Sequence, residues 1–167
     1  MENATKALLM AAGVLIGLAI LSLAVYLFTT FGVASAEMHG QIEQDRINQF
    51  NAQFTSYQQR NDLTIYDIIT VVNLAKNNNE YYELNTSTNS NNYITVNAEL
   101  KSGSKANLER QSTEELQELI KKETDINNMI DYTDENGTTY KGLYHYSCTV
   151  TVNDNTRRVN LIRFYKN

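Results

Sequence analysis

ALLMAAGVLIGLAILSLAVYLFTTFG, residues 7–32, decides how the rest of the chain is interpreted, because it contains no charged side chain. An α-helix rises 1.5 Å per residue and about 20 apolar residues cross the hydrocarbon core of a bilayer. The hydrophobic region of a secretory signal peptide is shorter, roughly 7–15 residues. The stretch therefore predicts a helix that spans a membrane.

The residues that follow leave open whether this helix is retained. Ala34, Ser35 and Ala36 form the A-x-A pattern that signal peptidase can read, and cleavage there would leave a soluble exported domain. The flank before the apolar stretch is weak for a signal peptide, since Lys6 is balanced by Glu2. Together with the length of the stretch, this favours an uncleaved anchor over residues 1–36, followed by a domain over residues 37–167.

The charges beside the span predict its orientation. Lys6 and the chain amino group precede it, whereas the next basic residue, Arg46, comes after Glu37, Glu43 and Asp45. Basic residues favour the cytoplasmic side of a span. We therefore expect a single-pass protein of the cell membrane with its N-terminus in the cytoplasm and its domain outside.

Two glycines lie one helical turn apart inside the span. Gly13 and Gly17 form a G-x-x-x-G pattern, which lets a second helix approach closely. The alternative is that glycine is simply frequent in membrane helices. The pair is a candidate for helix–helix contact.

A polar helical pattern continues after the span, over residues 37–60. Ile47, Phe50, Phe54 and Tyr57 repeat at three- and four-residue spacing and form one apolar seam. The chain contains no proline, so a continuous helix from about residue 4 to 60 is predicted, its second half packed on the domain. The seam could instead form a coiled coil with another copy, although two heptads are few for that.

The remaining residues predict further helices and a C-terminal sheet. Thr64 and Asp67 open a helix over residues 63–79, and Ser112 and Glu115 form a capping box for a helix over residues 112–123. Between them we expect a polar loop at 85–92, a half-buried strand at 93–100 and a polar connection.

The end of the chain reads as β-structure. Asn136-Gly137 is a strong hairpin signal, and it is followed by one long strand from Tyr140 to Val152, a turn at 153–156 and a returning strand at 157–165. The fold class is α+β: a long N-terminal transmembrane-plus-amphipathic helix, followed by a small domain of helices packed on a C-terminal antiparallel sheet.

The composition argues against several kinds of chemistry. The net charge of −5 disfavours nucleic-acid binding, and the basic residues at 156–158 are expected to solvate a turn. Cys148 is the only cysteine, so no intramolecular disulfide can form, and His145 is expected on the opposite strand face. The acids at 131–135 lack the spacing of a calcium loop. No catalytic motif or cofactor or metal pattern occurs, so we do not expect an enzyme.

In outline, an apolar helix extended by an amphipathic one and followed by a C-terminal sheet resembles type IV pilins and the related pseudopilins. The resemblance implies a subunit that sits in the membrane lipid and assembles through its N-terminal helix with itself or a membrane apparatus. Residues 7–36 contain no acid, so the glutamate of the family's apolar helix has no counterpart here. Residues 1–17 also resemble small bacterial single-span membrane proteins, which implies no activity.

Two functions remain open at this point. The first is a membrane-anchored structural or assembly subunit of a cell-surface or secretion apparatus. The second is a tethered extracytoplasmic module that senses or binds a ligand or wall polymer through tyrosines such as Tyr81, Tyr82, Tyr93 and Tyr165.

Overall fold

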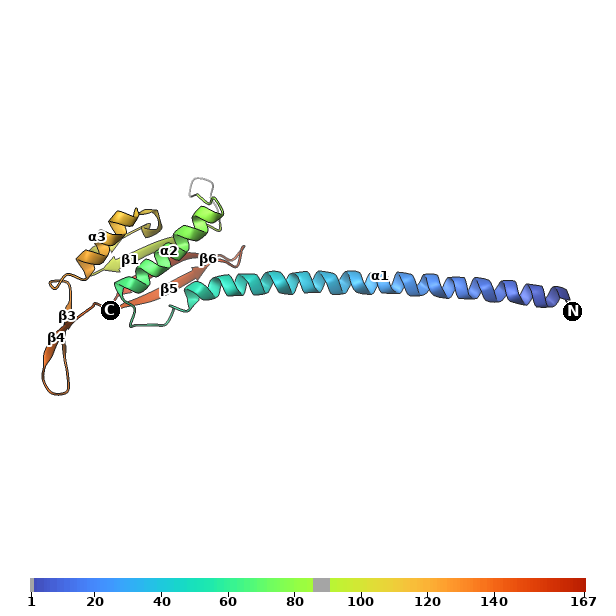
Figure 1. Cartoon of the computed structure of the whole chain (residues 1–167), viewed down its shortest axis with the longest axis horizontal. Coiled ribbons are helices and arrows are strands. Elements are labelled where there is room, and N and C mark those ends of the chain that lie inside the picture. Colours follow the sequence, from blue (N-terminus) through green and yellow to red (C-terminus); the bar gives the residue numbers. More distant parts are fainter. Residues whose placement is uncertain (1, 86–90) are drawn as a thin grey trace. The chain divides into compact units, whose positions relative to one another are not determined.

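The computed structural model describes residues 2–85 and 91–167 and has the predicted α+β class (Figure 1). The chain divides into two compact units, the first ending at Arg46 and the second formed by Ile47–Asn167. Its elements in order are α1 (Glu2–Thr55), α2 (Ile65–Tyr81), β1 (Thr95–Leu100), β2 (Gly103–Lys105), the 3₁₀ helix η2 (Leu108–Arg110), α3 (Thr113–Glu123), β3 (Ile130–Thr133), β4 (Thr139–Gly142), β5 (Tyr146–Val152) and β6 (Val159–Lys166). Most of the predicted loop at 85–92 lies outside the described residues.

Helix α1 is a single helix, as the absence of proline predicted. It ends at Thr55, however, so the predicted continuation to residue 60 is wrong. The amides of Tyr57 and Gln58 bond three residues back, to Phe54 and Thr55, and Gln59 adopts a left-handed φ of 68°. These tight turns close the helix and direct the chain toward α2.

The starts of α2 and α3 confirm the predicted caps. The Thr64 amide donates to the Asp67 carboxylate at 2.8 Å. At α3, the Ser112 amide donates to the Glu115 carboxylate at 2.8 Å and the Ser112 hydroxyl accepts from the Glu115 amide at 3.2 Å. Each cap satisfies amide groups that would otherwise lack a partner at the helix N-terminus.

Helix α2 continues two residues beyond the predicted end, because its asparagine run is held by the domain. Asn79 is buried, and its side-chain amide donates to the Ile94 carbonyl at 2.8 Å and accepts from the Ile94 amide at 2.9 Å. Asparagine is a weak helix former, but two bonds of this kind outweigh that preference. The helix therefore reaches Tyr81.

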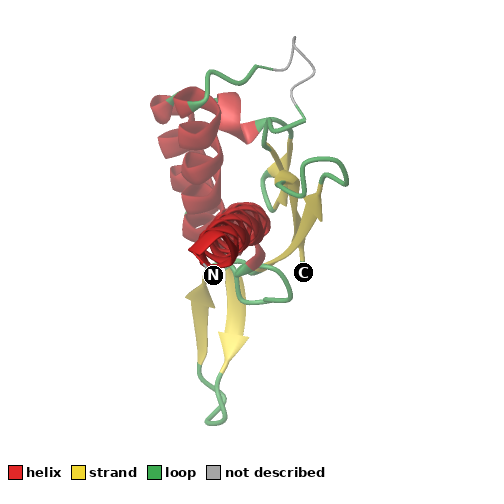
Figure 2. Ribbon diagram, turned by 90° about the vertical axis from the view of Figure 1, so that its right-hand side faces the viewer, coloured by secondary structure: helices red, strands yellow, loops and turns green. Residues whose placement is uncertain are grey.

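Four strands form the main sheet in the order β2-β1-β6-β5. The β5–β6 pair is antiparallel, as predicted, whereas β1 and β6 are parallel. The polar connection expected after β1 is wrong in part, because it contains β2, which pairs antiparallel with β1, and the 3₁₀ helix η2. Parallel strands need a long crossover connection. In the sequence, α3 and the β3–β4 hairpin come between β1 and the last two strands, and they supply that connection. Helices α2 and α3 cover one face of this sheet and leave the other face open (Figure 2).

The hydrophobic core lies between the covered sheet face and these helices. Its strand residues alternate along β1 and β6, and its helix residues come mainly from α2. Its largest fully buried apolar side chains include Phe54, Leu63, Ile68, Tyr146 and Phe164.

The long strand predicted from Tyr140 to Val152 is wrong, because it is broken into β4 and β5. Strand β4 pairs with β3 in a separate two-stranded hairpin, whereas β5 pairs with β6. The break lies at residues 143–145, and directly after it the backbone of Tyr146, the first residue of β5, bonds in both directions to Leu63, at 2.8 and 3.2 Å. The hairpin turn follows the sequence signal, with Gly137 at a φ of 81°.

Candidate membrane and assembly surfaces

The N-terminal part of α1 presents apolar side chains on all sides. Leu8, Leu15, Leu23, Phe28 and Phe31 are among many that are exposed in the structure. Among the described residues, α1 is the one helix long and apolar enough to cross a membrane, judged by length and composition. A helix that is hydrophobic all round belongs in an apolar surrounding. This part of α1 therefore fits a single-pass membrane protein.

Gly13 and Gly17 lie one turn apart on this part of α1. A Cβ atom added to either glycine would meet no atom within 4 Å other than its own helical surroundings. Larger side chains at these positions therefore cause no clash within the chain. Any effect of enlarging them must come from a neighbouring molecule or from lipid.

The predicted seam is divided between core and surface. Phe54 is only 1% exposed and belongs to the core, with Phe50 and Tyr57 packed against it, whereas Ile47 is half-buried outside that cluster. The rings of Phe50 and Phe54 meet edge to face, with centroids 5.5 Å apart. The seam thus packs on its own domain, and Phe54 is not available to a coiled coil.

Asn51 fastens the end of α1 to the sheet, and sequence reasoning missed it. Its side-chain amide donates to the Arg157 carbonyl at 2.7 Å and accepts from the Val159 amide at 2.9 Å. Asn51 is thereby bonded to the start of β6 across more than a hundred residues. No local pattern signals such a contact, because asparagine is frequent throughout the chain.

Arg158 adds a second link between these elements. Its guanidinium lies 4.0 Å above the centroid of Phe50 and 5.5 Å from that of Tyr82. Arginine over an aromatic face is attractive, and the more so when water is excluded. The prediction that residues 156–158 only solvate a turn is therefore wrong for Arg158, which is half-buried.

Among the described residues, two carboxylates are buried, and each accepts a hydrogen bond from a backbone amide. Glu109 accepts from the Val96 amide at 2.9 Å and from the Tyr93 hydroxyl at 3.1 Å. Burial is the largest cause that raises the pKa of Tyr93. These bonds satisfy Glu109 and attach η2 to β1, which is a structural arrangement.

The second buried carboxylate, Glu123, accepts from the Ser102 amide at 2.9 Å and from the Tyr146 hydroxyl at 2.5 Å. Burial, followed by this bond to Glu123, raises the pKa of Tyr146. The network ties the end of α3 to β5 and to the β1–β2 turn.

Cys148 and His145 do not form a pair. Burial raises the pKa of the Cys148 thiol to about 12, so the reactive thiolate is suppressed. His145 Nδ1 lies 3.1 Å from the Tyr132 hydroxyl instead. In the part of the chain that the structure describes, no group of three or more His, Cys, Asp or Glu side chains is placed to hold a metal ion.

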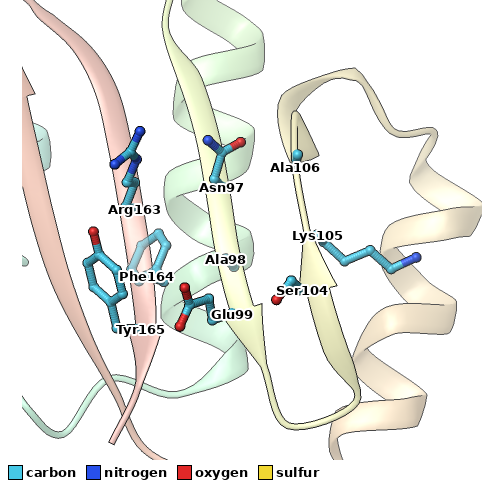
Figure 3. A pocket seen from close by; sticks show the side chains of 9 residues that line it. All are labelled: Asn97, Ala98, Glu99, Ser104, Lys105, Ala106, Arg163, Phe164 and Tyr165. Atoms are coloured by element: carbon cyan, nitrogen blue, oxygen red, sulfur yellow. The ribbon is translucent and has the colours of Figure 1, made fainter.

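The open face of the main sheet carries a groove that the sequence did not predict (Figure 3). It has a volume of about 350 Å³, and Asn97, Glu99, Ser104, Lys105, Arg163 and Tyr165 line it. The register places Asn97 beside Arg163 and Glu99 beside Ser104. Of the tyrosines considered as ligand contacts, Tyr165 alone lines this groove, while Tyr81 and Tyr82 lie together at the end of α2.

No known family model matches the chain, and no curated protein or solved structure is similar to it. The fold and surfaces described above therefore define the class: a small α+β domain whose core includes the end of a long, apolar N-terminal helix.

Proposed function

We propose that this protein is a membrane-anchored structural or assembly subunit of a cell-surface or secretion apparatus, pilin-like in outline. The observation that carries the proposal is that one helix, α1, contains the uncharged segment and also supplies Phe54 to the domain core. A helix that only tethers a domain to the membrane does not need to supply a residue to the core of that domain. A helix that both inserts in lipid and builds the domain suits a subunit that assembles through it.

In this proposal the N-terminus lies in the cytoplasm, the domain lies outside, and neighbouring copies meet along Gly13 and Gly17. Lipid provides no hydrophobic drive between helices, so close packing has to supply the attraction. Two glycines with open space above them allow such packing.

Cross-linking of the full-length protein in membranes tests this contact. We expect multimers of the wild type and at least about threefold fewer of Gly13→Ile/Gly17→Ile, which corresponds to about 0.7 kcal/mol. The matched control is Ala11→Ile/Ala19→Ile, whose positions lie about 160° and 120° round the helix from Gly13. A wild type that is monomeric at native expression, or equal multimers in the glycine variant, would contradict the glycine contact.

A second candidate function is a tethered binding module. The observation in its favour is the exposed pair Tyr81 and Tyr82, 81% and 54% exposed, whose rings meet edge to face at 4.8 Å. Exposed aromatic pairs suit stacking on a ligand. Retention of the wild-type protein on isolated cell-wall polymer, lost in Tyr81→Ala/Tyr82→Ala and without multimers, would favour this function.

A further inference from the structure

A polar stretch of α1 follows the uncharged segment. Residues 37–46, here termed the stalk, contain acidic and basic side chains and continue the helix without a break. None of these residues is buried. Helices in proteins draw most of their stability from a packed face, and a glycine such as Gly40 in the interior of a helix weakens it. A partner that packs on one face of the stalk would therefore stabilise it.

The stalk has one apolar face. Met38 and Ile42 are its only large apolar side chains, and they are 62% and 48% exposed. They lie four residues apart, so they are on the same side of the helix, one turn above the other. The polar and charged side chains of the stalk occupy the positions between them and after them.

The apolar face of the stalk is in line with the glycine pair of the membrane segment. At 3.6 residues per turn, Met38 and Ile42 lie within about 40° of the midpoint between Gly13 and Gly17 round the helix axis. Ala24, between the two sites, falls on the same side. A second copy that packs along the glycines in a near-parallel arrangement therefore also meets the apolar face of the stalk.

Opposite charges flank this face. Asp45 and Arg46 are exposed, and neither forms an ion pair among the described residues. Measured from Ile42, Asp45 lies about 60° round the helix in one direction and Arg46 about 40° in the other. In a parallel pair related by a two-fold axis, the Arg46 flank of each helix faces the Asp45 flank of the other. In an antiparallel pair, by contrast, flanks of the same kind would meet.

The membrane selects between these two arrangements. Copies that are anchored by residues 7–32 share one orientation and one depth, so their stalks run parallel and at equal height. Copies joined through their membrane segments also hold their stalks at a high effective concentration. A short contact between the stalks can therefore form although it buries few side chains.

We propose that the stalks of two copies of this chain pack against each other in parallel. Met38 and Ile42 form the seam, and Asp45 of each copy faces Arg46 of the other. The same patch is used on both copies, so the contact is isologous and closes a dimer. Charge complementarity sets its orientation and register more than its affinity. The inference rests on the proposed assembly function and specifies how copies pair outside the lipid.

Disulfide formation between copies tests the seam. The full-length protein in membranes carries Cys148→Ala and one new cysteine, and two copies with different tags are co-expressed and oxidised. A disulfide needs Cα atoms about 4.4–6.8 Å apart. We expect Met38→Cys and Ile42→Cys each to give at least about threefold more mixed-tag dimer than Gly40→Cys, which lies about 160° round the helix from both. Equal yields at the three positions, or disulfides to a different protein instead, would overturn the proposal.

Charge exchange tests the orientation of the pair. In the Ile42→Cys protein, Arg46→Glu makes both flanks acidic and should lower the dimer yield at least about threefold. The double change Asp45→Arg/Arg46→Glu exchanges the two flanks and should recover at least half of the yield. Gln44→Glu adds a negative charge about 160° round the helix from Ile42 and is the control that should leave the yield unchanged. A yield that Arg46→Glu does not lower, or that the exchange does not recover, overturns the pairing of Asp45 with Arg46.

The two proposals fail in distinguishable ways. If the wild type forms no multimers in membranes, the assembly function itself fails. If multimers form and depend on Gly13 and Gly17, while Ile42→Cys gives no more dimer than Gly40→Cys, the failure is confined to the stalk.

Discussion

The guanidinium carbon of Arg158 lies 4.0 Å from the centroid of the Phe50 ring and so links the turn before β6 to the last turns of α1. A cation this close to a ring contributes about 0.5–2 kcal/mol, depending on how far water is excluded. A double-mutant cycle of Arg158→Gln and Phe50→Leu should therefore show a coupling energy in that range, measured by urea unfolding in detergent. The matched control is Arg110→Gln with Phe50→Leu, which should be additive within about 0.5 kcal/mol. Additivity in both cycles would mean that the ring and the guanidinium do not interact energetically.

Asn51 should be important for stability although it lies on a helix surface. Asn51→Ala removes the acceptor of the Val159 amide and a donor to the Arg157 carbonyl. We expect the free energy of unfolding to fall by about 1–3 kcal/mol. Gln53→Ala, at an exposed position two residues away, is the control and should change it by less than about 0.5 kcal/mol. Equal effects of the two variants would contradict the role given to Asn51.

Glu123 should tolerate an amide better than truncation. Glu123→Ala removes both acceptors, leaving the Ser102 amide and the Tyr146 hydroxyl without this partner. A bond to a charged group contributes about 1.5–3 kcal/mol, so a loss of at least that size is expected in thermal or urea unfolding. Glu123→Gln keeps one acceptor oxygen and should lose clearly less. The opposite order would show that Glu123 stabilises nothing through these bonds.

Burial of Cys148 predicts a loss of stability at high pH. Its pKa rises from 9.0 to about 12 on folding, so the folded thiol keeps a proton that the unfolded thiol releases. The contribution of the Cys148 thiol to the free energy of unfolding is complete below pH 9 and declines as the pH rises toward 12. Between these pH values, the free energy of unfolding of the wild type should fall with rising pH more steeply than that of Cys148→Ala. The difference between the two slopes should be up to about 1.4 kcal/mol per pH unit. Equal slopes for both proteins would contradict this prediction.

The membrane segment makes a prediction about topology and processing. Protease added to intact spheroplasts should remove a C-terminal tag, since the domain is proposed to lie outside. N-terminal sequencing of the native protein should find residues 1–36 retained. A protected tag would reverse the orientation, and a chain beginning at Glu37 would replace the anchor by a cleaved signal peptide.

The features that could be predicted from the sequence are those that depend on residues close together along the chain. The caps at Thr64 and Ser112, the turn at Asn136-Gly137 and the uncharged stretch of α1 each rest on residues within a few positions, and each appears as expected. The parallel pairing of β1 with β6 joins residues more than sixty positions apart, which no local pattern encodes.

The same distinction applies to the candidate surfaces. The glycine pair and the seam follow from helical spacing, although burial of Phe54 was needed to show that the seam packs inward. The groove was missed because it combines Asn97 and Arg163, which become neighbours only through strand register. Asn51 was missed because its two partners lie at the far end of the chain.

The attachment of Asn51 to β6 has a mechanical consequence. Strand β6 lies inside the main sheet, between β1 and β5, and not at its edge. Tension along α1 therefore has a path through Asn51, beside those through the backbone and Phe54, to a strand that two neighbours restrain. An edge strand could be peeled away one bond at a time, whereas pulling β6 out would require both of its ladders to rupture. A domain held in this way can bear load without first unravelling its sheet.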